Sequence, residues 1–149
     1  MENSDKVLQL STGKIIADGK QHLVFAGDTK TEKQHLHFFG RNIERFINLL
    51  PEVQNNITKA TSMAEKDPDL QQVIYKTILS QFNSNANILE VSCYNGKPYC
   101  FIKRWFFLPE DSSTWIPTTS SFQIDISMMT YIVQFLKKHY QQPTEEEKK

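Results

Sequence analysis

The dipeptide Asn95-Gly96, which lies between two runs of β-forming residues, is the feature that most constrains the fold of this chain. A two-residue turn of the primed type needs positive φ at both central positions, and asparagine and glycine tolerate this best. The sequence therefore predicts an antiparallel hairpin over residues 87–107, with Tyr94 opposite Lys97. The pairs expected farther from the turn are Cys93 with Pro98, Ser92 with Tyr99, Val91 with Cys100, Glu90 with Phe101 and Leu89 with Ile102.

The predicted hairpin has two chemically different faces, because side chains alternate across a strand. The apolar face, expected in the core, carries Leu89, Val91, Cys93, Cys100 and Ile102. The opposite face carries Glu90, Ser92, Tyr94, Lys97, Tyr99, Phe101, Lys103 and Trp105. Aromatic rings interleaved with lysines are typical of surfaces that hold single-stranded nucleic acid, where bases stack on the rings and cations hold the phosphates. The alternative is that a helix or a second sheet covers this face.

The segments after the hairpin follow the order of a known module. A turn-rich loop leads to Pro117, a short alternating strand occupies 118–126, and an amphipathic helix starts at Ser127. This order resembles the C-terminal module of the positive cofactor 4 family, transcriptional coactivators that bind single-stranded DNA, and the resemblance covers 87–140. The residues that carry it are Leu89, Val91, Tyr94, Gly96-Lys97, Cys100, Ile102, Lys103, Trp105-Phe106, Pro117, Phe122 and Ile124.

The resemblance implies a strongly curved antiparallel sheet, a helix that pairs two modules into a dimer, and a single strand lying on the concave sheet surface. Carried over by position, it places nucleic-acid contacts at Tyr94, Lys97, Lys103 and Phe106. The rings of Tyr99, Phe101 and Trp105 join this set because they share the hairpin face. The implied protein is nuclear and acts in transcription, with single-stranded DNA or RNA and other proteins as partners.

Charge limits how strongly such a surface would bind. Seventeen basic and seventeen acidic residues cancel, so any attraction for nucleic acid has to be local. Ser92, Asn95 and Trp115-Ile116 leave fewer cations than the family pattern, which predicts weaker and less salt-sensitive binding. The alternative function is a protein-interaction or assembly module that keeps the fold and has lost or weakened nucleic-acid binding.

The sequence indicates no enzyme, cofactor or metal. There is no nucleophile motif and no phosphate-binding glycine loop. Cys93 and Cys100 are diagonal in the predicted register, so we expect two reduced core residues. His35 and His37 point the same way from a strand and His22 could approach them, but no cysteine or nearby carboxylate completes a ligand set.

The rest of the chain predicts an α+β protein with two strand-helix units that form a pseudo-dimer joined by a helical connection. The expected divisions are 1–50, an N-terminal strand-helix half; 51–85, the helical connection; 86–142, the half that resembles positive cofactor 4; and 143–149, a solvated tail. In the first division, strands are expected at 7–10, 14–17, 22–26 and 35–39, and a helix over 41–50 that Pro51 ends or kinks. In the second, Asp67-Pro68 is expected to separate two helices.

An internal repeat is a further expectation. At a spacing of 86 positions, Leu36 and Phe38 align with Phe122 and Ile124, Ile43 with Met129, Phe46-Ile47 with Ile132-Val133, and Leu49-Leu50 with Phe135-Leu136. A chance alignment of two strand-helix endings is the alternative. With a genuine repeat, one chain holds both halves of a dimer; without it, the C-terminal helix would pair two chains.

No apolar run or N-terminal signal indicates a membrane segment, so an intracellular soluble protein is expected.

Overall fold

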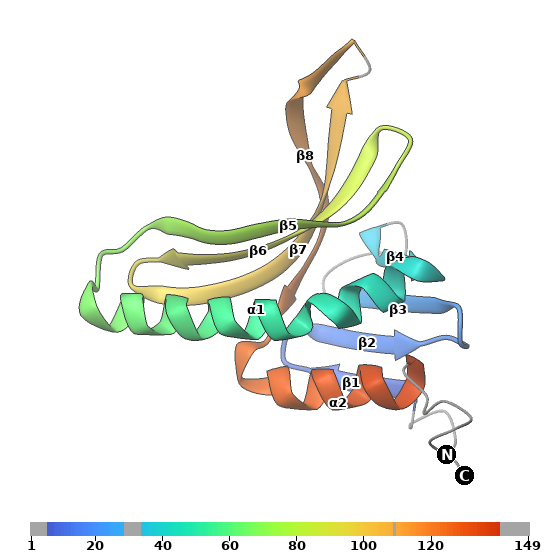
Figure 1. The fold of residues 1–149 in the computed structure, drawn as a ribbon, viewed down its shortest axis with the longest axis horizontal. Helices are drawn as coiled ribbons and strands as arrows, with labels where there is room; N and C mark the ends of the chain where they lie inside the picture. Colours follow the sequence, from blue (N-terminus) through green and yellow to red (C-terminus); the bar gives the residue numbers. More distant parts are fainter. Residues whose placement is uncertain (1–5, 29–33, 109, 141–149) are drawn as a thin grey trace.

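The computed structural model describes residues 6–28, 34–108 and 110–140, in which a four-stranded antiparallel sheet followed by a helix occurs twice (Figure 1). The first unit contains β1 (Val7–Leu10), β2 (Gly13–Ala17), β3 (His22–Gly27), β4 (Leu36–Phe39) and α1 (Arg41–Lys66). The second contains β5 (Gln72–Phe82), β6 (Asn85–Tyr94), β7 (Lys97–Leu108), β8 (Asp111–Ile124), the short 3₁₀ helix η3 (Ile126–Met128) and α2 (Met129–Tyr140). In both sheets the strands neighbour one another in chain order. The α+β class with two strand-helix units is confirmed; the proposed tail, 143–149, lies outside the described residues.

Helix α1 is shared by the two sheets. Its 26 residues give it a length of about 39 Å. Near its start, the Phe46 ring lies 5.7 Å from that of Phe25, in the first sheet. Farther along, the carbonyl oxygen of Ala60 accepts a hydrogen bond from Cys93 Sγ of the second sheet, at 3.3 Å. Figure 1 shows α1 running from β4 along the strands β5 to β7, so a single apolar stripe closes both halves of the core.

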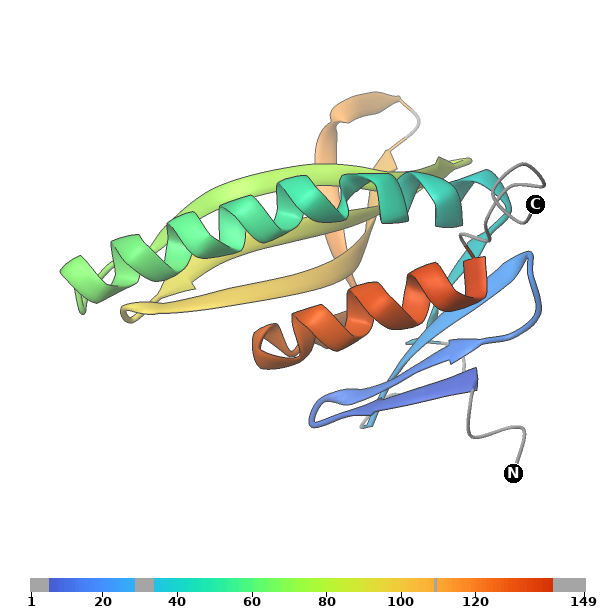
Figure 2. The same ribbon diagram turned by 60° about the horizontal axis from the view of Figure 1, so that its bottom comes forward.

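The two helices occupy equivalent places in the two units. Helix α2 packs beside α1 (Figure 2), which is the helix pairing expected of a pseudo-dimer. Three of the five helix pairs that align at a spacing of 86 are buried in both helices: Ile43 and Met129, Phe46 and Ile132, and Leu50 and Leu136. The repeated architecture therefore includes the packing of the helices, although the two sheets differ in the length of their strands.

The predicted Asn95-Gly96 hairpin is confirmed in its turn and in its register. Asn95 has φ 52° and Gly96 has φ 71°, as a two-residue primed turn requires. Every pair from Tyr94 with Lys97 to Leu89 with Ile102 is formed as expected. The apolar face of the hairpin is buried, and its five residues are Leu89, Val91, Cys93, Cys100 and Ile102.

The expectation of a second helix between 68 and 83 is wrong, because Gln72–Phe82 form strand β5. Irregularities in the pairing with β6, between Val73 and Tyr75 and between Ile78 and Ser80, interrupt the two-residue alternation of this strand. Bulges of this kind place apolar residues at a spacing that imitates a helix. The helical connection is therefore only the continuation of α1, whose C-cap is Asp67, and the second sheet begins before residue 86.

The expectation that the first helix ends at Pro51 is wrong, because α1 continues to Lys66. Proline removes one backbone donor and clashes with the preceding turn, at a cost of about 3 kcal/mol. Leu50 and Val53, on either side of it, are both buried. Burial of these neighbours thus outweighs the local preference of proline to end a helix.

The turn between β1 and β2 joins the first unit to the end of β8. Thr12 Oγ1 donates to the carbonyl oxygen of Gln123 at 2.6 Å, and Ser11 Oγ donates to Asp125 at 2.8 Å. Asp125 also accepts from the backbone N–H of Ser127 at 3.2 Å and therefore caps η3. The helical segment thus begins one turn before α2, with Asp125 rather than Ser127 as its cap. These hydrogen bonds from Ser127 and Ser11 lower the pKa of the Asp125 carboxyl.

Substituting Gly96 by alanine should destabilise the protein more than substituting Gly19. Both glycines have positive φ, 71° and 82°, which costs an alanine about 1–2 kcal/mol. A Cβ at Gly96 would also lie 2.5 Å from the carbonyl oxygen of Pro68, whereas a Cβ at Gly19 meets nothing within 4 Å. Urea unfolding should show a further loss of roughly 1–3 kcal/mol for Gly96→Ala. Equal losses for the two variants would contradict the contact with Pro68.

The Cys100 thiol should be inert in the folded protein. Both cysteines are buried and free, and burial raises the pKa of Cys100 to about 12. Since the thiolate is the reactive form, a Cys93→Ala variant should react very slowly with Ellman's reagent at pH 8 and promptly in concentrated guanidinium chloride. Rapid stoichiometric labelling without denaturant would show that Cys100 is accessible.

Candidate nucleic-acid interface

The face of the second sheet that is turned away from α1, here called the outer face, carries the rings and lysines singled out in the sequence. Cross-strand register assigns to it Val73, Lys76, Ile78, Ile88, Glu90, Ser92, Tyr94, Lys97, Tyr99, Phe101, Lys103, Trp105, Ser121 and Gln123. In the described part of the chain, α1 covers the inner face and no helix lies over the outer one (Figures 1 and 2). Tyr94 is 56% exposed, and the other rings of the hairpin face are partly exposed.

Two ammonium groups lie near the ring of Trp105. Lys76 Nζ is 5.3 Å from the centroid of its ring and Lys103 Nζ is 6.0 Å away. These distances are those of cation-π attraction, in which the negative face of the indole holds the cation. Either ammonium can turn from the ring to a phosphate, and a base can then take its place on the ring. The surroundings of this one residue therefore offer both a ring on which a base can stack and cations that can hold phosphates.

The outer face is hollowed along the hairpin. One hollow of about 410 Å³ is lined by Glu90, Ser92, Tyr94, Tyr99, Phe101, Lys103, Ser121 and Gln123. A second hollow, of about 300 Å³, is lined by Lys76, Thr77, Ile78, Ile88, Trp105 and Trp115. The contact of Lys103 with Trp105 joins the two. We call the two hollows together the outer-face groove.

The groove continues toward the first unit. A hollow of about 400 Å³ is lined by Ser11, Thr12, Gly27, Asp28, Ser121, Phe122 and Gln123. Ser121 and Gln123 line this hollow and the hairpin hollow alike. This hollow is therefore adjacent to the hairpin hollow and lies across the edge strand β8, beside the turn between β1 and β2.

Most of the residues proposed from the sequence lie together. Tyr94, Tyr99, Phe101 and Lys103 line the first hollow, and Trp105 lines the second. Lys97 is exposed beside the turn, opposite Tyr94. Phe106, which was placed in the set by resemblance, does not join them. It pairs with Ile116 and follows Trp105 in the strand, so its side chain is on the other face.

Among the described residues, Lys76 is the one cation lining the groove that the sequence did not single out. It was overlooked because 68–83 was expected to be helical, and the β-branched residues around it, Val73, Ile74, Thr77 and Ile78, were the signal for a strand. With Lys76 on the neighbouring strand β5, the cations around Trp105 come from two strands rather than from one hairpin.

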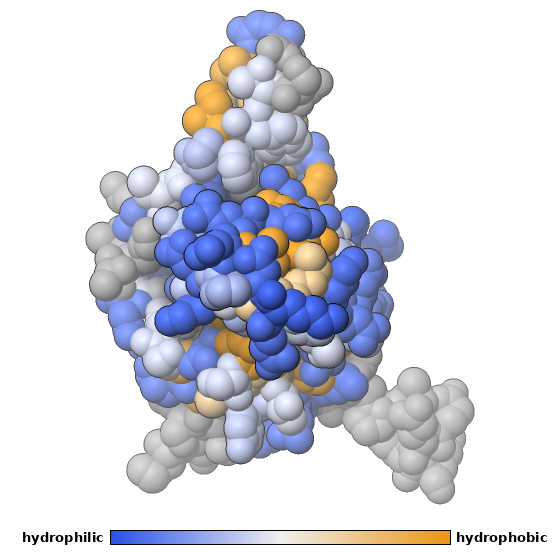
Figure 3. All heavy atoms as spheres, turned by 90° about the vertical axis from the view of Figure 1, so that its left-hand side faces the viewer, coloured by the Kyte–Doolittle hydropathy of each residue, from blue (hydrophilic) through white to orange (hydrophobic). Residues whose placement is uncertain are grey.

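Beyond the groove, the ends of β7 and β8 project from the body of the protein as a two-stranded arm (Figure 1). The rings of Phe107 and Trp115 pack at a centroid distance of 4.9 Å, and Ile116 is 42% exposed. Figure 3 shows apolar surface along one edge of this arm, whose tip is hydrophilic, above a body that is mainly hydrophilic on the side in view. The arm thus presents an apolar edge that no helix covers in the described structure.

No family model matches this sequence, and no curated protein matches it. The resemblance to positive cofactor 4 therefore stays a prediction.

Among the described residues, no group of three or more His, Cys, Asp or Glu could hold a metal ion. No helix in the described ranges is long and apolar enough to cross a membrane.

The lysines beside Trp105 should make its fluorescence more sensitive to anions than to cations. A Trp115→Phe variant leaves Trp105 as the sole tryptophan, and its quenching by iodide and by caesium can be compared. Two nearby ammonium groups concentrate iodide and repel caesium. We expect a higher iodide-to-caesium ratio of quenching constants than for free tryptophan amide, and a lower ratio after Lys76→Ala and Lys103→Ala. A ratio unaffected by removing both lysines would contradict the geometry.

Proposed function

We propose that the protein binds single-stranded nucleic acid in the outer-face groove, with bases stacked on its rings and phosphates held by its lysines. The observation that carries the proposal is the uncovered outer face, on which the ammonium groups of Lys76 and Lys103 both lie near the ring of Trp105. A large ring is usually buried for stability. Here several rings border open hollows, which favours a ligand with flat apolar faces.

The same surface sets the character of the binding. Each stacked base contributes roughly 1–3 kcal/mol, so the rings would supply most of the affinity. Lys76, Lys97 and Lys103 are the cations of the outer face, and three phosphate contacts give a salt slope of roughly −2 for a single strand. The binding should therefore depend only moderately on salt and discriminate little between base sequences.

The resemblance to positive cofactor 4 also suggests where in the cell the protein would act and in which process. On that basis we propose a nuclear protein that acts in transcription and has protein partners as well as single-stranded DNA or RNA. The doubled strand-helix architecture supports the resemblance in fold alone, because the two units in one chain correspond to the dimer that the resemblance implies.

The second candidate function is a protein-interaction module. It is favoured by the β7–β8 arm, in which Ile116 is 42% exposed and no helix covers the Phe107-Trp115 pair in the described structure. In this case an apolar segment of another protein, rather than a nucleic acid, would cover the aromatic surface.

Replacing Trp105 by alanine should weaken the binding of single strands by roughly 5- to 150-fold, the equivalent of one stacked base. Fluorescence anisotropy of a labelled oligo-dT at low and moderate salt measures this directly. Lys103→Ala should make the salt slope less steep by about 0.7.

Phe106→Ala is the matched control for Trp105→Ala. Phe106 is the adjacent aromatic residue of β7 but lies on the other face, so its loss should have a much smaller effect on affinity. If wild-type protein fails to bind oligo-dT at low salt, the nucleic-acid proposal is wrong. Competition by an apolar partner peptide would then favour the interaction module.

A further inference from the structure

A second platform of rings lies on the first sheet, away from the outer-face groove. His22 comes from β3, and His37 and Phe39 come from β4. The planes of the three rings are within 2° to 11° of one another, and the His22 and Phe39 rings stack with their centroids 4.6 Å apart. Phe39 is nevertheless 57% exposed. The molecule thus presents a flat apolar ring to solvent, supported from behind.

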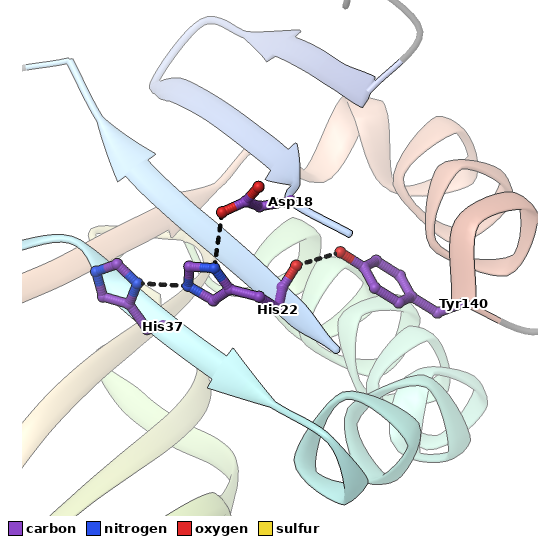
Figure 4. Close-up of polar contacts among 4 residues, drawn as sticks. All are labelled: Asp18, His22, His37 and Tyr140. Carbon is purple, nitrogen blue, oxygen red and sulfur yellow. Dashed lines mark hydrogen bonds and ion pairs between the residues drawn. The ribbon is translucent and has the colours of Figure 1, made fainter. Parts of the chain in front are cut away.

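Hydrogen bonds hold this platform in place (Figure 4). Asp18 Oδ2 lies 2.9 Å from His22 Nδ1, and His22 Nε2 lies 2.9 Å from His37 Nδ1. When the carboxylate accepts the Nδ1–H of His22, the other nitrogen of His22 accepts from His37. Tyr140 donates to the carbonyl oxygen of His22 at 2.6 Å. The rings are therefore ordered before any ligand arrives, which lowers the entropic cost of binding.

Beside the platform, a cavity of about 460 Å³ lies where the two units meet. It is lined by His37 and Phe39 of β4, Asn42 of α1, Ser80 of β5 and Arg104 of β7. Its volume is within the range of small-molecule sites. The cavity thus combines an exposed ring with amide, hydroxyl and guanidinium groups drawn from distant parts of the chain.

Arg104 is the cation of this cavity and is only partly paired. It is half-buried, and burial lowers its pKa. Its Nε donates to Asn87 Oδ1 at 3.5 Å, and Asn87 Nδ2 in turn donates to Ser80 Oγ at 2.9 Å. Among the described residues its side chain has no further hydrogen bond, so both Nη groups remain available. A guanidinium fork with free donors in a sheltered cavity suits a phosphate.

We propose that this cavity binds one nucleotide, with its base stacked on Phe39 and its phosphate held by Arg104. Asn42 and Ser80 are placed to bond the sugar or the edge of the base. The nucleotide is either free or part of a bound strand, because the same chemistry serves both. This site is distinct from the outer-face groove. Binding of a free nucleotide does not depend on the function proposed above, whereas binding of a nucleotide within a strand rests on it.

Calorimetric titration of the whole protein with dTMP tests the proposal, with thymidine and benzoate as comparison ligands. Binding of dTMP should exceed that of thymidine, which lacks the phosphate, and that of benzoate, which lacks a base. Phe39→Ala should weaken dTMP binding by roughly 5- to 150-fold, the effect expected for one stacked base. Arg104→Lys should also weaken it, because the charge stays while the fork is lost. Phe39 is exposed, so its replacement keeps the test valid even if an Arg104 variant unfolds.

Tyr94→Ala is the matched control, because Tyr94 is an equally exposed ring in the outer-face groove. It should weaken the binding of oligo-dT and leave that of dTMP unchanged. If Phe39→Ala weakens dTMP alone, the ligand is a free nucleotide; if it also weakens oligo-dT, the cavity holds a nucleotide of the strand.

The proposal is overturned if benzoate binds as well as dTMP, or if dTMP fails to bind at millimolar concentration and Phe39→Ala leaves oligo-dT affinity unchanged. Binding of dTMP without binding of oligo-dT would remove the groove proposal and leave this one standing.

Discussion

The packing of α1 against both sheets is the constraint on which the rest of the structure depends. Phe46 at one end of its stripe joins the rings of the first sheet, and Ala60 farther along lies against Cys93 of the second. Burial of such a stripe removes a large apolar area from water at about 25 cal/mol per Å². Because the same helix closes both cores, the two units cannot move apart without exposing it.

This arrangement decides which surfaces remain for function. Each sheet has one face in the core, and the side chains of its other face remain accessible to solvent and ligands. On the second sheet that remainder is the outer-face groove around Trp105. On the first sheet it is the ring platform of His22, His37 and Phe39. The absence of net charge makes these local clusters, rather than a field of the whole protein, the source of any attraction.

Local signals predicted much of the fold and the part of the groove that the hairpin supplies. The Asn95-Gly96 turn sets the register of the hairpin within a few residues, so both faces follow from alternation alone. Expectations failed where packing at a distance outweighed local preference. The helix continues through Pro51 because Leu50 and Val53, on either side of the proline, are buried in the core. The irregularities of β5 hide its strand pattern because they shift its apolar residues relative to β6.

The sequence by itself determined the turn and the two faces of individual strands. Both follow from residues that are close together in the chain: the turn from its dipeptide, and the faces from the alternation of side chains. Only the tertiary structure decided which surfaces are joined. Lys76 reaches Trp105 from another strand, and His37 shares a cavity with Arg104 from the other unit. No local pattern encodes such pairs, because the contact of residues far apart in sequence depends on how the shared helix seats the two sheets.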